Sequence, residues 1–162
     1  MECFVFSVPP KGRVYLELVQ FGCSVASKLL LVVRDPQIDP GEGIRGALLT
    51  LQPYLIKSGV ASQWPGTILL SADMATLYWY RIAEGLEPLL LHMQSDLFEW
   101  LHPQAPEDPC FCRHDDEPVL VTISHEHDAY LLLSEPEIAL MRSRFPVLAA
   151  AVRWEGSTAA DP

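Results

Sequence analysis

The chain has 162 residues, of which 49% are hydrophobic and 20% are charged, and its mean hydropathy is +0.16. This composition excludes intrinsic disorder, which requires low hydrophobicity, and the length favours one domain. The formal net charge of −10 argues against nucleic acid as a partner, because phosphate binding requires a basic surface. We predict a single domain over residues 1–153 and a flexible C-terminal tail over residues 154–162.

No targeting segment is predicted. The first ten residues carry Glu2 and lack a basic region, unlike a secretory signal. The most apolar window, residues 14–33, is interrupted by Glu17 and Lys28, so it does not predict a membrane span. In such a chain, the four cysteines are expected to be reduced thiols. We therefore expect a cytoplasmic protein that does not bind membranes.

Apolar patterns in the first half of the chain predict strands and one helix. The continuous apolar run at residues 28–33 is typical of an interior strand. Apolar residues recur at helical spacing from Ile44 to Leu55, and Pro53 is expected to kink that helix. Residues 58–66 are rich in turn formers and predict a loop. The other predicted strands are residues 3–8, 14–21, 67–71 and 76–82.

The second half predicts two helices separated by a meander of short strands. The apolar stripe of residues 84–101 indicates the first helix. Ser134 and Glu137 have the spacing of a capping box, which opens the second helix. The strands of the meander are residues 110–113, 119–124 and 129–133. Because strands and helices do not alternate strictly, we predict an α+β fold: an antiparallel or mixed sheet with about three helices packed over it. A mixed α/β sheet is the alternative.

A glycine-rich string at residues 41–46 matches the G-x-G-x-x-G pattern of dinucleotide sites. The preceding strand is predicted to end near Val33, too far away to deliver the first glycine to a pyrophosphate. Glu42 would also place negative charge beside a phosphate. We interpret the string as a loop that opens a helix, and no cofactor is predicted.

Cysteines and histidines cluster in the meander and suggest a metal site as an alternative function. Thiols and imidazoles are the ligands that zinc prefers, but the C-x-C spacing is not that of common zinc sites. A hydrolase centred on Ser124 and His125 is a related alternative, although neighbours on a strand point to opposite faces. We interpret these cysteines as buried strand residues and predict no metal. The residues of the alternative site are Cys110, Cys112, His114, His125 and His127.

Negative charge is concentrated in the second half of the chain. Residues 1–81 carry a net charge of +1, whereas residues 82–162 carry −11. Residues 96–137 alone contain eleven acidic residues and one basic residue. Such a concentration costs self-repulsion and raises the rate of encounter with a basic protein. A solvated acidic face without a partner is the alternative.

Two segments carry a resemblance to a known class of proteins. Residues 107–112, Glu-Asp-Pro-Cys-Phe-Cys, and residues 118–126, Pro-Val-Leu-Val-Thr-Ile-Ser-His-Glu, form a strand-turn-strand pattern. This pattern resembles that of some small acidic bacterial immunity proteins. The resemblance covers about twenty residues and implies a non-enzymatic protein that neutralises a cognate toxin.

The charge pattern and the resemblance together predict a protein-binding module that masks the basic surface or active site of a toxin. Phe111 or Trp100 could anchor such a partner if it were exposed. The alternatives are the metal protein or hydrolase described above and a structural subunit of a larger complex. The predicted partner-binding residues are Glu107, Asp108, Asp115, Asp116, Glu117, Glu126 and Asp128.

Overall fold

A computed structural model describes residues 1–35, 39–70 and 73–157. An antiparallel sheet of eight strands dominates it, in the order β10-β1-β9-β8-β7-β2-β6-β3. A separate hairpin is formed by β4 (Gln63–Trp64) and β5 (Thr67–Ile68). The strands of the large sheet are β1 (Glu2–Phe6), β2 (Lys28–Arg34), β3 (Leu55–Ala61), β6 (Ala75–Arg81), β7 (Glu107–Cys112), β8 (Pro118–Ile123), β9 (Asp128–Leu133) and β10 (Val152–Ser157).

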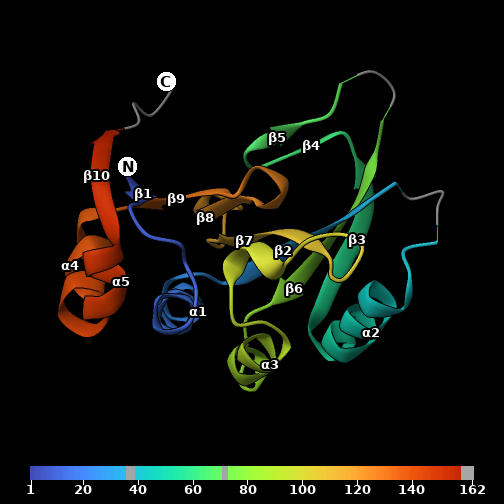
Figure 1. The fold of residues 1–162 in the computed structure, drawn as a ribbon, viewed down its shortest axis with the longest axis horizontal. Coiled ribbons are helices and arrows are strands. Elements are labelled where there is room, and N and C mark those ends of the chain that lie inside the picture. The colour runs from blue at the N-terminus through green and yellow to red at the C-terminus, as the bar shows by residue number, and fades with distance from the viewer. Residues whose placement is uncertain (36–38, 71–72, 158–162) are drawn as a thin grey trace.

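All the α-helices lie on one face of the sheet, and the β4–β5 hairpin lies on the other (Figure 1). This arrangement confirms the α+β class, but the described residues form five α-helices rather than about three. No described helix has the length and apolar character needed to cross a membrane. The helices are α1 (Arg13–Val25), α2 (Glu42–Leu51), α3 (Leu86–Met93), α4 (Glu135–Arg144) and α5 (Pro146–Ala151), with short 3₁₀ turns η1 (Gln52–Tyr54), η2 (Leu97–Glu99) and η3 (Ser124–Glu126).

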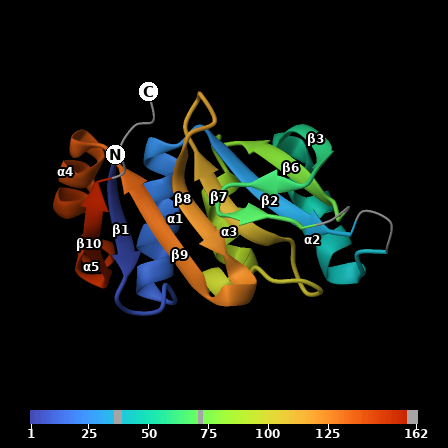
Figure 2. The ribbon, with the colours of Figure 1, turned by 90° about the horizontal axis from the view of Figure 1, so that it is seen from above.

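The sheet buries apolar side chains on both faces. The larger core lies between the sheet and the helices, where Phe21, Leu29 and Trp100 are almost fully buried. The smaller core lies under the β4–β5 hairpin, which runs over the strands near β2 and β8 when the sheet is seen from above (Figure 2). It contains Trp64, Cys110 and other side chains of β2, β6 and β7. The strand β2 is therefore covered on both faces, as its continuous apolar run predicted.

Several predicted elements are confirmed. The strands over 28–33 and 76–82 and the three strands of the meander occur within a few residues of their predicted bounds. The capping box forms, because the Ser134 side chain accepts the Glu137 backbone N–H and the Glu137 carboxylate accepts the Ser134 backbone N–H at 2.7 Å. The glycine-rich string at residues 41–46 opens a helix as predicted but is not a loop, because only Gly41 precedes α2 and residues 42–46 form its first turns.

Four predictions of secondary structure need correction. Residues 14–21 form part of helix α1 rather than a strand, since Tyr15, Leu18 and Val19 share its buried face. The predicted loop at 58–66 contains part of β3 and all of β4. The predicted helix at 84–101 divides into α3 and η2. Residues 67–71 contribute only the short β5, and Ser71 lies outside the described residues.

The prediction of a C-terminal tail from residue 154 onwards also needs correction. Residues 154–157 belong to β10, which pairs with β1 in the sheet. The remaining predicted tail, residues 158–162, lies outside the described residues.

Candidate functional site

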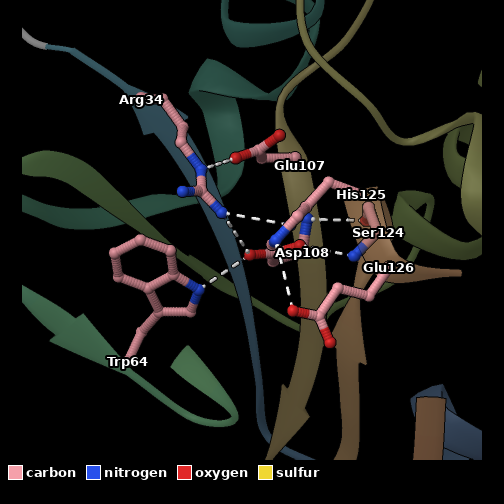
Figure 3. A network of polar contacts seen from close by, with 7 residues as sticks. All are labelled: Arg34, Trp64, Glu107, Asp108, Ser124, His125 and Glu126. Carbon is pink, nitrogen blue, oxygen red and sulfur yellow. Dashed lines mark hydrogen bonds and ion pairs between the residues drawn. The ribbon is translucent and has the colours of Figure 1, made fainter. Parts of the chain in front are cut away.

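A β-bulge in β7 sets the geometry of the site. Leu30 of β2 pairs with Cys110 of β7, and Val32 of β2 pairs with Glu107 of β7. Between these two pairs β2 has one residue and β7 has two, so β7 carries one extra residue there. Asp108 lies in this bulge with a φ of 52°, a left-handed conformation that aspartate adopts more readily than most residues. The bulge turns the carboxylates of both Glu107 and Asp108 toward Arg34 (Figure 3).

Arg34, at the end of β2, is the cation of this site. Its Nε donates a hydrogen bond to Oε1 of Glu107, and its Nη2 lies 3.8 Å from Oδ2 of Asp108. The carboxylate side chains are 4% and 0% exposed, whereas the Arg34 side chain is 30% exposed. Two buried carboxylates therefore share one guanidinium, which is itself partly exposed to solvent.

Asp108 also connects the β4–β5 hairpin and the β8–β9 connection to β7. Its Oδ2 accepts a hydrogen bond from the Trp64 indole N–H at 2.9 Å, and its Oδ1 accepts one from the Ser124 backbone N–H at 2.7 Å. In return, Ser124 Oγ accepts the Asp108 backbone N–H at 3.0 Å. The Arg34 guanidinium lies 5.3 Å from the centre of the Trp64 ring, within cation–π range. We call Arg34, Trp64, Glu107, Asp108 and Ser124 the Arg34 network.

His125 extends the Arg34 network toward the solvent. Arg34 Nη2 lies 3.3 Å from His125 Nδ1, and His125 Nε2 lies 3.6 Å from a Glu126 carboxylate oxygen. A guanidinium can only donate, so Nδ1 is the acceptor of this bond. Among the described residues, no hydrogen bond joins the side chains of Ser124 and His125.

A groove lies on the other side of the β8–β9 connection. Its volume is about 480 Å³, and its walls come from the segment between β1 and α1, from the segment around η2 and from the start of β9. The His127 ring stacks on Phe98 with the ring centres 5.2 Å apart and an angle of 9° between the planes. Asp96, Asp128 and one basic residue, Lys11, also line the groove.

Exposed carboxylates stand beside this aromatic stack. Asp128 is exposed, and the Glu126 side chain, next to His127 in the chain, is 62% exposed. Asp96 is half-buried, and its Oδ1 accepts the Phe98 backbone N–H at 2.9 Å, which fixes the start of η2. We call the surface formed by Asp96, Phe98, Glu126, His127 and Asp128 the acidic groove.

The structure separates the seven predicted partner-binding residues into three groups. Glu107 and Asp108 are buried in the Arg34 network, so they are not available to a partner in this structure and their predicted role is corrected. Glu126 and Asp128 are exposed at the same end of the sheet. The third group lies in the β7–β8 turn, at the opposite ends of these strands: Asp115, Asp116 and Glu117.

Two carboxylates of the β7–β8 turn are bonded to other groups of this chain. Asp116 forms an ion pair with Lys28, and Asp115 Oδ1 accepts the Glu117 backbone N–H at 3.2 Å. The predicted anchors are also corrected, because Phe111 and Trp100 are only 2% and 1% exposed.

The residues of the alternative metal site do not come together. The Cys110 and Cys112 sulfurs lie 3.5 Å apart in the core under the hairpin, and burial, with the hydrogen bond to Cys112, raises the pKa of the Cys110 thiol. His114 follows β7, whereas His125 and His127 lie at the other end of the sheet. In residues 1–35, 39–70 and 73–157, no three His, Cys, Asp or Glu side chains are placed to hold a metal ion together.

Four residues of these sites were not predicted from the sequence: Arg34, Trp64, Asp96 and Phe98. Asp96 precedes the apolar run of η2, and an aspartate in that position is a recognisable capping signal. Arg34 and Trp64 carry no such signal, since their partner Asp108 lies 74 and 44 residues away in the chain.

No protein-family model matches this chain, and comparisons with curated proteins and with solved structures find no significant match.

Proposed function

We propose that this chain is a cytoplasmic, non-enzymatic protein-binding module, and that its acidic groove binds a basic protein. We further propose that it acts as an immunity protein, which neutralises a toxin by covering the basic surface or active site of that toxin. One observation carries the proposal: exposed carboxylates flank a groove that contains a stacked aromatic pair.

The chemistry of the acidic groove suits arginine or lysine side chains of a partner. A guanidinium can stack on an aromatic ring while its N–H groups donate to a carboxylate. Phe98 and His127 offer the rings, and Asp96 and Asp128 offer carboxylates on the same walls. Charge attraction would speed the encounter, and burial of the aromatic pair would add affinity.

The Arg34 network supports the proposal by holding the β8–β9 connection in place. Ser124 is bonded through both its backbone N–H and its hydroxyl oxygen to Asp108, and His125 is bonded to Arg34. The other side of the same connection is fixed by the stack of His127 on Phe98. A surface fixed before binding loses less conformational entropy when a partner binds, so affinity is higher.

The β7–β8 turn is the competing acidic surface. The charge of Asp116 is countered by Lys28, and Asp115 is bonded within the turn. The acidic groove instead combines carboxylates with a concave surface and aromatic rings, which are common in the centres of protein interfaces. We therefore assign binding to the acidic groove.

The proposal is tested by isolating the full chain, tagged, from its source cells at low and at high salt. We expect one basic protein to co-purify at low salt and to be lost as salt screens the charges. Mass spectrometry identifies this protein, and an activity assay shows whether the chain inhibits it. Capture of only neutral or acidic proteins, or capture of a basic protein that salt does not weaken, would contradict the proposal.

A further inference from the structure

The face of the sheet that carries the β4–β5 hairpin is covered over only part of its width. The core under the hairpin is formed with side chains of β2, β6 and β7. Among the described residues, that core contains no side chain of β1 or β9. Figure 2 shows that the hairpin does not extend over these two strands. We call the surface that β1 and β9 present on the hairpin side the open face.

The side chains of the open face are apolar, whereas a sheet face in solvent is normally polar. Successive residues of a strand point to opposite faces. Phe4 of β1 and Leu131 of β9 belong to the core on the helix side, so the residues on either side of each point to the open face. The four residues of the open face, all partly exposed, are Cys3, Val5, Tyr130 and Leu132.

These four side chains form one block. Cys3 pairs with Leu132, and Val5 pairs with Tyr130, so the block occupies adjacent positions on two neighbouring strands. The apolar run of residues 129–133 in β9 is uninterrupted, which is typical of a strand covered on both faces, as β2 is. The open face therefore has the composition of a surface that another molecule covers.

Tyr130 is the residue of the open face best suited to anchor a partner. Among the residues that the structure describes, none forms a hydrogen bond with its hydroxyl. Burial is the main cause that raises the pKa of this hydroxyl, and the charge of Asp128 raises it further, so the group is a neutral donor. A tyrosine combines a large apolar ring with a hydrogen-bond donor, and tyrosines are enriched among the residues that dominate binding free energy.

The charges around the open face favour a basic protein as its occupant. Asp128 lies two residues before Tyr130 in β9, on the same side of the strand. Burial raises the pKa of the Cys3 thiol, and the carboxylates of Glu155 and Asp128 raise it further, so both lie close to the block. Two copies of this chain that met through the open face would bring these carboxylates together and repel each other, and nucleic acid would be repelled as well.

The open face is also continuous with the acidic groove. Val5 of the block and Asp128 beside it both line the groove. A protein bound in the groove therefore lies directly beside the open face.

We propose that the basic partner of the acidic groove also covers the open face, with Tyr130 as its anchor. This inference rests on the proposed function and extends the interface from the groove onto the sheet. The apolar block would form the dehydrated centre of the interface, and the carboxylates of the groove would form its charged margin. Protein interfaces are commonly built in this way.

The test places the photoreactive residue p-benzoyl-phenylalanine in the full chain, in its source cells, at one position at a time. Position 130 probes the open face, and position 8 probes the acidic groove, because Val8 lines the groove and is 46% exposed. Position 78 is the matched control, since Tyr78 is also partly exposed but packs on the helix side. We expect irradiation to join one and the same basic protein at positions 130 and 8, and not at position 78.

The crosslinks separate failure of this inference from failure of the proposed function. Suppose that position 8 captures a basic protein while position 130 captures nothing, a different protein, a second copy or another part of its own chain. The inference is then overturned and the acidic groove is not. If position 8 captures no basic protein, both are overturned.

Titration with the purified crosslinked protein measures the contribution of Tyr130. Tyr130→Ala should weaken binding at least about tenfold, whereas Tyr78→Ala should leave it unchanged. Equal effects of the two variants would contradict the role of Tyr130 as the anchor. The crosslink at position 130 does not depend on how Tyr130→Ala folds, because p-benzoyl-phenylalanine keeps an aromatic ring there.

Discussion

The two ends of the β7–β8 strand pair contain similar numbers of acidic residues but use them differently. At the bulge end, Glu107 and Asp108 are buried against Arg34, and Glu126 and Asp128 stand exposed beside the groove. At the turn end, residues 115–117 are all acidic and exposed. Carboxylates that look alike in the sequence therefore hold the fold together in one place and face the solvent in another.

Burial, rather than the density of acidic residues, therefore decides what a carboxylate contributes to the stability of the fold. A buried carboxylate must be paired, so it fixes the elements around it. An exposed carboxylate adds little to stability and remains available to a partner.

The largest effect is expected from Arg34→Ala. It leaves Glu107 and Asp108 buried without their cation, and we expect the free energy of unfolding to fall by about 3 kcal/mol. Lys28→Ala is the matched control at the turn end, where Asp116 is 48% exposed, and it should cost less than about 1 kcal/mol. Urea unfolding measures both. Equal losses in the two variants would contradict the comparison.

A smaller effect is expected from Trp64→Phe. This change keeps an aromatic ring near Arg34 but removes the indole N–H that donates to Asp108. Loss of a hydrogen bond to a buried carboxylate should lower the free energy of unfolding by about 2 kcal/mol. Trp79→Phe provides the control, because Trp79 packs against the same core and lies outside the Arg34 network. If the two variants lose the same stability, the hydrogen bond to Asp108 contributes nothing.

The ion pair of Glu137 with Arg113 lies near the turn end and is partly buried. It tests whether burial makes a carboxylate stabilising there, as it does at the bulge end. Glu137 accepts two hydrogen bonds from Arg113, at 2.9 and 2.6 Å. Burial raises the pKa of Glu137, but hydrogen bonds from Arg113 and Ser134 together hold it below its ordinary value of 4.5. The stabilisation is therefore complete above that pH and is lost as the pH falls through the lowered pKa.

Glu137→Gln should consequently lower the free energy of unfolding by about 1 kcal/mol at neutral pH. The difference from the wild type should shrink as the pH falls below 4.5. Urea unfolding at several pH values measures it. A difference that stays constant down to acid pH would show that the charge of Glu137 does not stabilise the fold.

The smallest effect is expected from Glu117→Gln in the exposed turn. We expect a change of less than about 0.5 kcal/mol, because solvent screens this carboxylate. Thermal unfolding of this variant beside Glu137→Gln provides the comparison. A loss as large as that of Glu137→Gln would mean that exposure does not separate the two kinds of carboxylate.

Local signals in the sequence account for the elements that could be predicted. The apolar run of β2, the meander and the capping box of Ser134 and Glu137 each depend on neighbours within a few residues. Helix α1 was mistaken for a strand because alternating apolar residues at 14, 16 and 18 hide the spacing of its buried face. Strand β3 was taken for a loop because its serine and glycine favour turns, whereas pairing with β6 determines its conformation.

The candidate site was predictable only in part. The acidic character of residues 126 and 128 is visible in the sequence, and both are exposed at the junction of η3 and β9. The burial of Glu107 and Asp108 depends on a bulge and on Arg34, which is more than 70 residues away. Nothing in the local sequence specifies that bulge. The groove likewise needs segments from β1, η2 and β9, which only the folded sheet brings together.

The most direct test compares two charge reversals in calorimetric titrations with the purified basic partner. One variant combines Glu126→Lys and Asp128→Lys, and the other combines Asp115→Lys and Glu117→Lys, so the two change the net charge equally. We predict that the first weakens binding at least tenfold more than the second, by about 1.4 kcal/mol or more. Equal weakening by the two variants, or a stronger effect of the second, would contradict the assignment of binding to the acidic groove.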